Sequence, residues 1–448
     1  MRVCMMEFGL YYKLYDDGLN LKSEGEAKAS LDDNYLTLAV MFGEPMLFAY
    51  TDIVGISDQD YKVDLFLTSK EKLNLWGLGY QYEDFLFQLY KFRNELMLKY
   101  LLMQEALIQA GFEAQYTMLD STGQITRVGN CEIRFYETAL ILLPQKNEPV
   151  RIPYCYINSI IKQDYKLTIT EEYSGKIELT KLGEKFDATA KTLSDALNKM
   201  ILRTQQNIKG MIPEATPIAI NKMSSLMKDG RAAKRKDLEK YSAEFWLRME
   251  KRIDEASMTT EYKFLNSLSA QDQVSVGIKR GLIGDLTGMY TWLLFPLVSP
   301  GTNRLSNMVA IEAFNDAENT GQTNSKNEET EQSEAKKESA ATGATYFFRI
   351  MDKREYAQIT DENLAQQLDR FIENINRAMI EINFRREPIY LSDNQLQSID
   401  YTQYRFAIAK IPSLRILRKL FAGRVIHTST EQWEADVTSL LAFNNKNR

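Results

Sequence analysis

The four residues Gln59-Asp60-Tyr61-Lys62 recur unchanged as Gln163-Asp164-Tyr165-Lys166, 104 positions further along the chain. The dipeptide Glu44-Pro45 recurs as Glu148-Pro149 at the same offset. Two matches at one constant spacing indicate that the chain contains a duplicated domain.

The duplication covers residues 8–98 and 112–202, which share 22 identities over 91 aligned positions without a gap. Because the alignment of the two copies needs no gap, we expect one fold and one strand order in both, with Tyr61 equivalent to Tyr165. We interpret the repeated tetrapeptide as a turn, in which Asp bonds to the main chain and Tyr packs its ring on the sheet, and not as a binding motif.

Within each copy the apolar spacing changes from that of strands to that of a helix. The first copy has strand character at residues 35–41, 46–56, 63–67 and 73–76. A helical stripe of apolar residues follows, formed by Phe85, Leu89, Phe92, Leu96 and Tyr100. The second copy has the same order, with strands between residues 130 and 179 and then a helix.

Antiparallel strands closed by one C-terminal helix resemble the pleckstrin-homology (PH) superfold, a bent sheet of about seven strands capped by a helix. The resemblance is architectural and covers roughly residues 8–101 and 112–203. Lipid-binding members carry Lys and Arg around the loop joining the first two strands. Here that loop is acidic, at Asp16-Asp17 and at Asp120, so phosphoinositide binding is not implied. The resemblance implies an α+β protein with two tandem PH-like domains.

The rest of the chain completes a four-part organisation. We predict PH-like repeat 1 at 1–104, PH-like repeat 2 at 105–210, a helical connector at 211–280 and a C-terminal α+β domain at 281–448. Residues 315–344 have no large apolar side chain and seven acids, so they are predicted to be a disordered loop between two strands. Because 286–384 also has strands followed by a helix, a third, diverged repeat is an alternative.

Three helices are predicted near the C-terminus. One begins at Thr360, one follows Pro412 and ends at Gly423, and one opens with the capping-box spacing of Ser429 and Gln432.

The numbers of histidines and cysteines argue against the commonest kinds of catalytic site. His427 is the only histidine, which excludes metal sites that need two imidazoles and weakens any Ser-His or Cys-His arrangement. Cys4, Cys131 and Cys155 are too widely spaced for a disulfide framework or a zinc site and are predicted to be free thiols. We therefore predict no catalytic residue, no metal and no cofactor, and the sequence indicates no small-molecule substrate.

Phosphate-binding motifs are missing as well. The nearest approach is a glycine series with Lys279 and Arg280 among its members, which we interpret as a loop or a packing face. The glycines are Gly277, Gly281, Gly284 and Gly288.

One basic amphipathic segment near 412–424 is the candidate binding site. Its cationic residues are Arg415, Arg418, Lys419 and Arg424. Such a helix can lie on a membrane surface or bind an acidic partner, although packing on its own domain is the more common outcome.

The sequence predicts a cytoplasmic, non-enzymatic scaffold or adaptor that binds another protein through the duplicated domains. No apolar leader is present at the N-terminus, and the net charge of −6 gives no reason to expect nucleic acid as a partner. Peripheral membrane association through the basic helix is one alternative. Chromatin- or nucleic-acid-linked binding is another, because tandem domains of this superfold occur in histone-chaperone subunits. An enzyme is the weakest.

Overall fold

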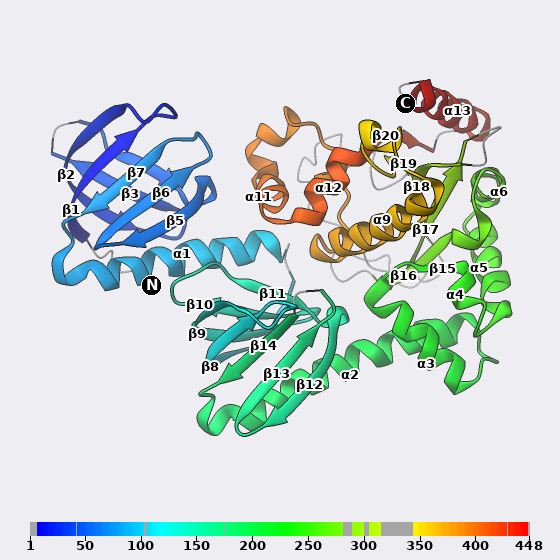
Figure 1. Ribbon diagram of the computed structural model, residues 1–448, viewed down its shortest axis with the longest axis horizontal. Coiled ribbons are helices and arrows are strands. Elements are labelled where there is room, and N and C mark those ends of the chain that lie inside the picture. Colours follow the sequence, from blue (N-terminus) through cyan, green and yellow to red (C-terminus); the bar gives the residue numbers. More distant parts are fainter. Residues whose placement is uncertain are drawn as a thin grey trace, which may run out of the picture. The chain divides into compact units, whose positions relative to one another are not determined.

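The computed structural model describes residues 7–41, 43–102, 105–173, 175–280, 289–299, 304–314, 344–427 and 429–446. These residues form an α+β protein with three antiparallel sheets (Figure 1). Their contacts divide the chain into two units. The first comprises residues 1–193 and 398–406, and the second comprises 194–397 and 407–448.

Repeat 1 is a seven-stranded antiparallel sheet followed by one helix. Its elements are β1 (Glu7–Tyr15), β2 (Leu21–Leu31), β3 (Tyr35–Val40), β4 (Met46–Ala49), β5 (Ile53–Gln59), β6 (Lys62–Leu67), β7 (Lys72–Trp76) and α1 (Tyr82–Leu101). The strand order is β4-β3-β2-β1-β7-β6-β5, so the first strand pairs with the last. The helix runs along the curled sheet (Figure 1).

Repeat 2 has the same strand order at the predicted offset. Its elements are β8 (Leu107–Leu119), β9 (Ile125–Tyr136), β10 (Ala139–Pro144), β11 (Val150–Pro153), β12 (Ile157–Gln163), β13 (Lys166–Glu171), β14 (Gly175–Thr180) and α2 (Phe186–Met211). The order β11-β10-β9-β8-β14-β13-β12 matches repeat 1 strand for strand. The predicted fold class, with bent antiparallel sheets each followed by a helix, is therefore confirmed.

Shared packing explains why several residues are identical in the two repeats. Tyr12 lies opposite Gly25 across β1 and β2, and Tyr116 lies opposite Gly129 across β8 and β9. A Cβ atom on Gly25 would lie 3.6 Å from the ring of Tyr12, so the ring covers the glycine. An aromatic side chain over a strand glycine restores packing that the glycine itself cannot supply.

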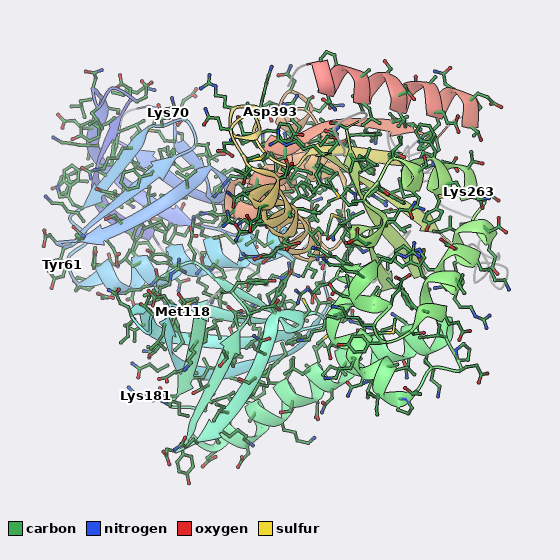
Figure 2. All side chains as sticks on the ribbon, turned by 45° about the vertical axis from the view of Figure 1, so that its right-hand side comes forward. Tyr61, Lys70, Met118, Lys181, Lys263 and Asp393 are labelled. Carbon is green, nitrogen blue, oxygen red and sulfur yellow. The ribbon has the colours of Figure 1, made fainter. Side chains whose placement is uncertain are left out.

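The repeated tetrapeptide forms the same hairpin turn in both repeats, as predicted. Asp60 and Tyr61 have φ of 52° and 57°, and Asp164 and Tyr165 have φ of 51° and 56°. Two consecutive residues with positive φ are typical of the type I′ turn that joins tightly paired strands. The prediction that Tyr packs on the sheet is wrong in detail. Tyr61 is exposed at the hairpin tip (Figure 2), and its ring meets Tyr82 of α1 edge-on at 5.3 Å.

The second unit contains a six-stranded antiparallel sheet and most of the shorter helices. Its strands, in the order in which they pair, are β15 (Ala233–Lys234), β16 (Ser275–Arg280), β17 (Met289–Val298), β18 (Leu305–Phe314), β19 (Ala344–Arg349) and β20 (Phe421–Ile426). Before β17 lie α3 (Pro217–Leu226), α4 (Arg235–Leu238), α5 (Ala243–Glu255) and α6 (Thr259–Ser267). After β19 lie α8 (Lys353–Tyr356), α9 (Asp361–Glu381), α10 (Glu387–Tyr390), α12 (Pro412–Leu420) and α13 (Thr430–Lys446). Two helices contain residues of both units: α2, which is divided after Leu193, and α11 (Thr402–Lys410), which is divided after Phe406.

This sheet does not have the strand order of repeats 1 and 2. Each strand pairs with the next one along the chain, and the last strand, β20, follows α9 and α12 in sequence. Residues 286–384 therefore do not form a third copy of the repeat. Residues 275–280, assigned by the sequence to the connector, form β16. Thr360 caps α9 as predicted, because its side chain accepts a hydrogen bond from the Asn363 N–H. The predicted disordered loop lies outside the described residues, apart from Ala344 in β19.

The basic helix after Pro412 is shorter than predicted. It ends at Leu420, and Phe421 begins β20, which pairs with β19. Gly423, which the prediction used as a helix stop, lies inside that strand with a φ of 156°. Among the described residues, no helix is both long enough and apolar enough to cross a membrane.

Candidate binding site

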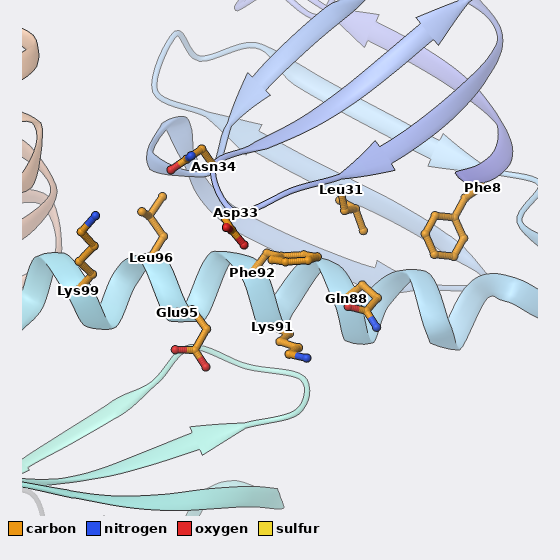
Figure 3. Close-up of a pocket in the computed structure, with 10 residues that line it drawn as sticks. All are labelled: Phe8, Leu31, Asp33, Asn34, Gln88, Lys91, Phe92, Glu95, Leu96 and Lys99. Atoms are coloured by element: carbon orange, nitrogen blue, oxygen red, sulfur yellow. The ribbon is translucent and has the colours of Figure 1, made fainter. Parts of the chain in front are cut away.

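A groove of about 550 Å³ lies between α1 and the β2–β3 turn of repeat 1 (Figure 3). Its lining residues are Phe8, Leu31, Asp33, Asn34, Gln88, Lys91, Phe92, Glu95, Leu96 and Lys99, and we call this surface the helix–turn groove. Phe8, Leu31 and Leu96 are almost fully buried and form an apolar floor. The turn and the helix supply the polar rim.

The β2–β3 turn is fixed by its own sequence. The Asp32 carboxylate accepts hydrogen bonds from the N–H groups of Asn34 and Tyr35, each at 2.8 Å. An aspartate that bonds to the main chain two and three residues ahead is a common way to close a tight turn. Asp33 is therefore held at the tip and points toward the helix above Phe92 (Figure 3).

Helix α1 provides the other wall because its apolar stripe is anchored in the sheet. Phe85 and Leu89 are fully buried, and the ring of Phe85 meets Phe8 edge-on at 5.3 Å. Burying side chains of this size contributes about 1.5–3 kcal/mol each. The helix therefore presents Lys91 and Lys99 on its exposed side.

The groove carries charges of both signs, and they differ in how far they are engaged. Lys91, Lys99 and Asp33 are exposed, and none of the three has an ion pair among the residues that the structure describes. Glu95 is already engaged, because Arg134 donates to both of its oxygens at 2.9 and 2.6 Å. Burial acts to lower the pKa of Arg134, but the hydrogen bonds with Glu95 and Glu132 raise it well above its usual range. The two lysines are therefore the cations that remain available to a ligand.

The corresponding turn of repeat 2 is closed in a different way. Tyr136 stands where repeat 1 has Asp32, and the Thr138 N–H donates instead to Glu105, from the segment that joins the repeats. The hydroxyl of Thr138 also donates to Glu105, at 2.8 Å. Arg151 forms an ion pair with the same carboxylate at 3.2 Å, and the Glu105 side chain has no exposed surface. In repeat 2 a buried carboxylate, paired with an arginine, thus accepts the hydrogen bond that an exposed aspartate of the turn itself accepts in repeat 1.

The predicted site residues around α12 are engaged within their own unit. Arg418 donates to the carbonyl oxygens of Pro388 and Leu391 at 2.8 and 2.9 Å and pairs with Asp393 at 2.8 Å. The apolar face of α12 packs against α9, with Leu414, Leu417 and Leu420 buried.

The other three cations do not form one helical patch. Arg415 donates to the Ala409 carbonyl, and Lys419 lies 3.3 Å from the Asp352 carboxylate. Arg424 is in β20, not in the helix, and its guanidinium lies 4.1 Å from the centre of the Tyr390 ring. The prediction that these four residues share a helix is therefore wrong for Arg424.

The glycine series does not form a phosphate cradle where the structure describes it. Gly277 lies in β16, where a Cβ atom would come within 2.2 Å of the Trp292 indole nitrogen. Lys279 is buried, and its ammonium pairs with Asp229 at 2.6 Å. Gly281, Gly284 and Gly288 lie outside the described residues.

His427 and the cysteines have packing roles. His427 lies 2.8 Å from the Thr345 hydroxyl, and burial lowers its pKa to about 4. Cys131 and Cys155 are buried and are not joined in a disulfide, whereas Cys4 lies outside the described residues. The described residues contain no cluster of three or more His, Cys, Asp or Glu side chains that could hold a metal ion.

Sequence reasoning missed the helix–turn groove, although a signal was present. At two helical positions of the groove the charge is reversed between the repeats, because Lys91 and Glu95 correspond to Asp195 and Lys199, whereas Lys99 corresponds to Arg203 and keeps its sign. Such reversals give the two copies surfaces of different charge on one fold. The exposed positions that differ were therefore more informative than the identical ones.

Comparison with known proteins does not assign this chain to a family. No model of a protein family matches it, and no curated protein matches it either. One solved structure with similarity is the C-terminal domain of an unknown protein from Leishmania infantum, with 15% identity and a TM-score of 0.19, covering 23% of this chain and 96% of that one. Another is the Spt16D Pob3N heterodimer, with 15% identity and a TM-score of 0.15, covering 38% of this chain and 84% of that one.

Proposed function

We propose that this protein is a non-enzymatic scaffold or adaptor that binds another protein through its duplicated PH-like domains. The observation that carries the proposal is the helix–turn groove of repeat 1, which has an apolar floor beside two exposed lysines. A ligand pocket typically combines an apolar lining with a few polar groups that fix orientation. Repeat 2 keeps apolar residues at the floor positions and Arg203 at the position of Lys99, but it has Asp195 in place of Lys91.

The groove chemistry favours a peptide segment with an apolar side chain flanked by carboxylates. The apolar side chain would cover Phe92 and the floor, and the carboxylates would meet Lys91 and Lys99. Because both lysines are exposed, each ion pair would contribute only about 0.2–1 kcal/mol, and most of the affinity would come from apolar burial. Binding through this groove should therefore weaken only moderately at high salt.

Membrane association through the basic helix is less well supported. It requires the apolar face of α12, and that face is buried against α9 within its own unit. Exposing it would cost the burial of Leu414, Leu417 and Leu420. No feature of the described surface favours nucleic acid over a protein partner.

Site-specific photo-crosslinking tests the proposal. A benzophenone amino acid is placed at Gln88 in the groove and, in a matched control, at Thr192, its counterpart in repeat 2. In native extract, the first variant should give a discrete protein adduct that Lys91→Asp and Lys99→Asp both weaken. Equal adducts from both positions, adducts only with lipid or nucleic acid, or no adduct at all would refute the role of the groove.

A further inference from the structure

Helix α1 has a second face, which contacts repeat 2. The Asn94 side chain donates to the Asn147 carbonyl at 2.7 Å, in the turn between β10 and β11. Four residues later, Leu98 belongs to a buried cluster with Tyr136 and Ile141 of repeat 2. Residues four apart lie on the same side of a helix, so Asn94 and Leu98 form one docking face.

The same two residues stand at the equivalent positions of α2. The offset of 104 pairs Asn94 with Asn198 and Leu98 with Leu202, and both pairs are identities. In α1 these side chains are almost fully buried because they contact the other repeat. Docking between domains therefore accounts for both residues in α1, and packing inside a repeat does not account for their presence in α2.

In α2 this face is open to solvent. Asn198 is exposed, and Ile201 and Leu202 are 37% and 56% exposed. The buried side of the helix lies elsewhere, at Thr204, whose hydroxyl accepts a hydrogen bond from the Asp229 N–H at 3.4 Å. The second unit thus covers one side of α2 and leaves the side equivalent to the docking face of α1 uncovered.

Two further positions of the docking face differ between the helices. Arg93 of α1 pairs with Glu148, whereas α2 has Leu197 at the equivalent position. Leu102 of α1 joins the buried cluster, whereas α2 has Gln206. A surface that fits α2 therefore has an apolar side chain in place of the rim acid and a shorter apolar contact.

Neither repeat of a second copy offers such a surface. In repeat 2 the strand-and-turn surface is covered by the end of α1. In repeat 1 the positions of Tyr136 and Ile141 hold Asp32 and Thr37, so the apolar contact is missing. The chain therefore does not supply the complement of this face.

We propose that the exposed face of α2, formed by Leu197, Asn198, Ile201 and Leu202, binds a domain of another protein that has a strand-and-turn surface like that of repeat 2. A main-chain carbonyl in the partner's turn accepts a hydrogen bond from Asn198, and apolar side chains of its adjoining strands cover Ile201 and Leu202. Apolar burial supplies most of the affinity, and the amide fixes the orientation. This surface is separate from the helix–turn groove and does not depend on it.

Releasing α1 from repeat 2 creates a test surface within the full chain. Leu98→Asp should displace the end of α1 from repeat 2, and the α2 face of another copy should then bind there. Sedimentation velocity should show concentration-dependent self-association of this variant. Adding Leu202→Asp should weaken the association at least tenfold. Adding Leu247→Asp, at an exposed leucine of α5, is the matched control and should leave the association unchanged.

The proposal is overturned if the Leu98→Asp chain is folded by circular dichroism but remains monomeric, or if its association is insensitive to Leu202→Asp. If Leu98→Asp prevents folding, Leu98→Ala allows the same comparison. Self-association of the unaltered chain that Leu202→Asp abolishes would contradict the assignment to another protein and make a second copy the occupant. The crosslink at Gln88 reports on the groove alone, so failure of the proposed function and failure of this surface are distinguishable.

Discussion

The two repeats close the same turn with different carboxylates. In repeat 1 the acid is Asp32, which lies in the turn itself and bonds to exposed main-chain N–H groups. In repeat 2 it is Glu105, which comes from the segment before β8 and is buried with Arg151. One fold thus supports a turn that is complete by itself and a turn that depends on a distant residue.

The difference shows how a duplicated domain can diverge without changing its fold. Once Glu105 serves the turn of repeat 2, the local aspartate is not needed, and Tyr136 at that position packs with Leu98 and Leu102 of α1. Repeat 2 therefore uses this position to bind the end of helix α1. Repeat 1 keeps its local turn, and the tip of that turn lies exposed beside the groove.

The largest effect is expected from the buried acid. Glu105→Ala should destabilise the protein by about 3–5 kcal/mol, because it removes one partner of a buried ion pair with Arg151 and also the acceptor of the Thr138 N–H. Glu105→Gln should cost less, since an amide oxygen can still accept that hydrogen bond. Urea denaturation monitored by circular dichroism measures both variants.

The matched change in repeat 1 should have a much smaller effect. Asp32→Ala removes exposed hydrogen bonds, whose net contribution is about 0.5–1.5 kcal/mol. Equal losses for Asp32→Ala and Glu105→Ala would show that the two turns are energetically alike, contrary to the comparison.

The next largest effect is expected from Arg93, because the helices that follow the two sheets differ at this position. Helix α2 has Leu197 at the equivalent position, and Arg93→Leu installs that residue in α1. The substitution should cost about 1.5–3 kcal/mol, the range for hydrogen bonds to charged groups, since it removes the bonds to Ile53 and Glu148.

Lys91→Leu on the exposed side of the same helix is the control and should change stability by less than about 0.5 kcal/mol. A double-mutant cycle with Glu148→Gln should give a clear coupling energy. Additive losses in that cycle would mean that Arg93 does not connect α1 to repeat 2.

The smallest effect is expected where the repeats are alike. Replacing Asp60-Tyr61 by Asn-Gly should stabilise the protein by up to about 1 kcal/mol, because these residues suit two positive φ angles better. The same replacement of Asp164-Tyr165 should give the same gain, because the φ angles of the two turns agree within 1°. Thermal unfolding measures both, and a gain in only one repeat would show that the turns are not equivalent.

Much of the fold could be predicted from sequence because duplication supplied two independent readings of one domain. The constant offset placed the turns and most strands, and Tyr12 with Gly25 shows that identities follow shared packing. Single-copy regions had no such check. Phe421 to Ile426 has apolar residues that fit a helix end as well as a strand, and only pairing with β19 decides between them.

The candidate site was harder to predict because it depends on which segments meet. Phe8, Asp33 and Lys99 are far apart in sequence, and only the strand order brings them to one groove. The basic segment after Pro412 gave a strong local pattern, but its apolar face is used within its own unit. A local pattern cannot reveal whether the face it predicts is already covered.

Amide hydrogen exchange at the two turns tests the central contrast most directly. The Thr138 N–H, bonded to a carboxylate without exposed surface, should exchange more slowly than the Asn34 N–H by a factor on the order of 100 or more, because its exchange requires local unfolding. Glu105→Gln should reduce that difference while leaving Asn34 unchanged. Comparable protection of the two amides in the unaltered protein would contradict the account, since it would mean that both turns are closed to the same degree.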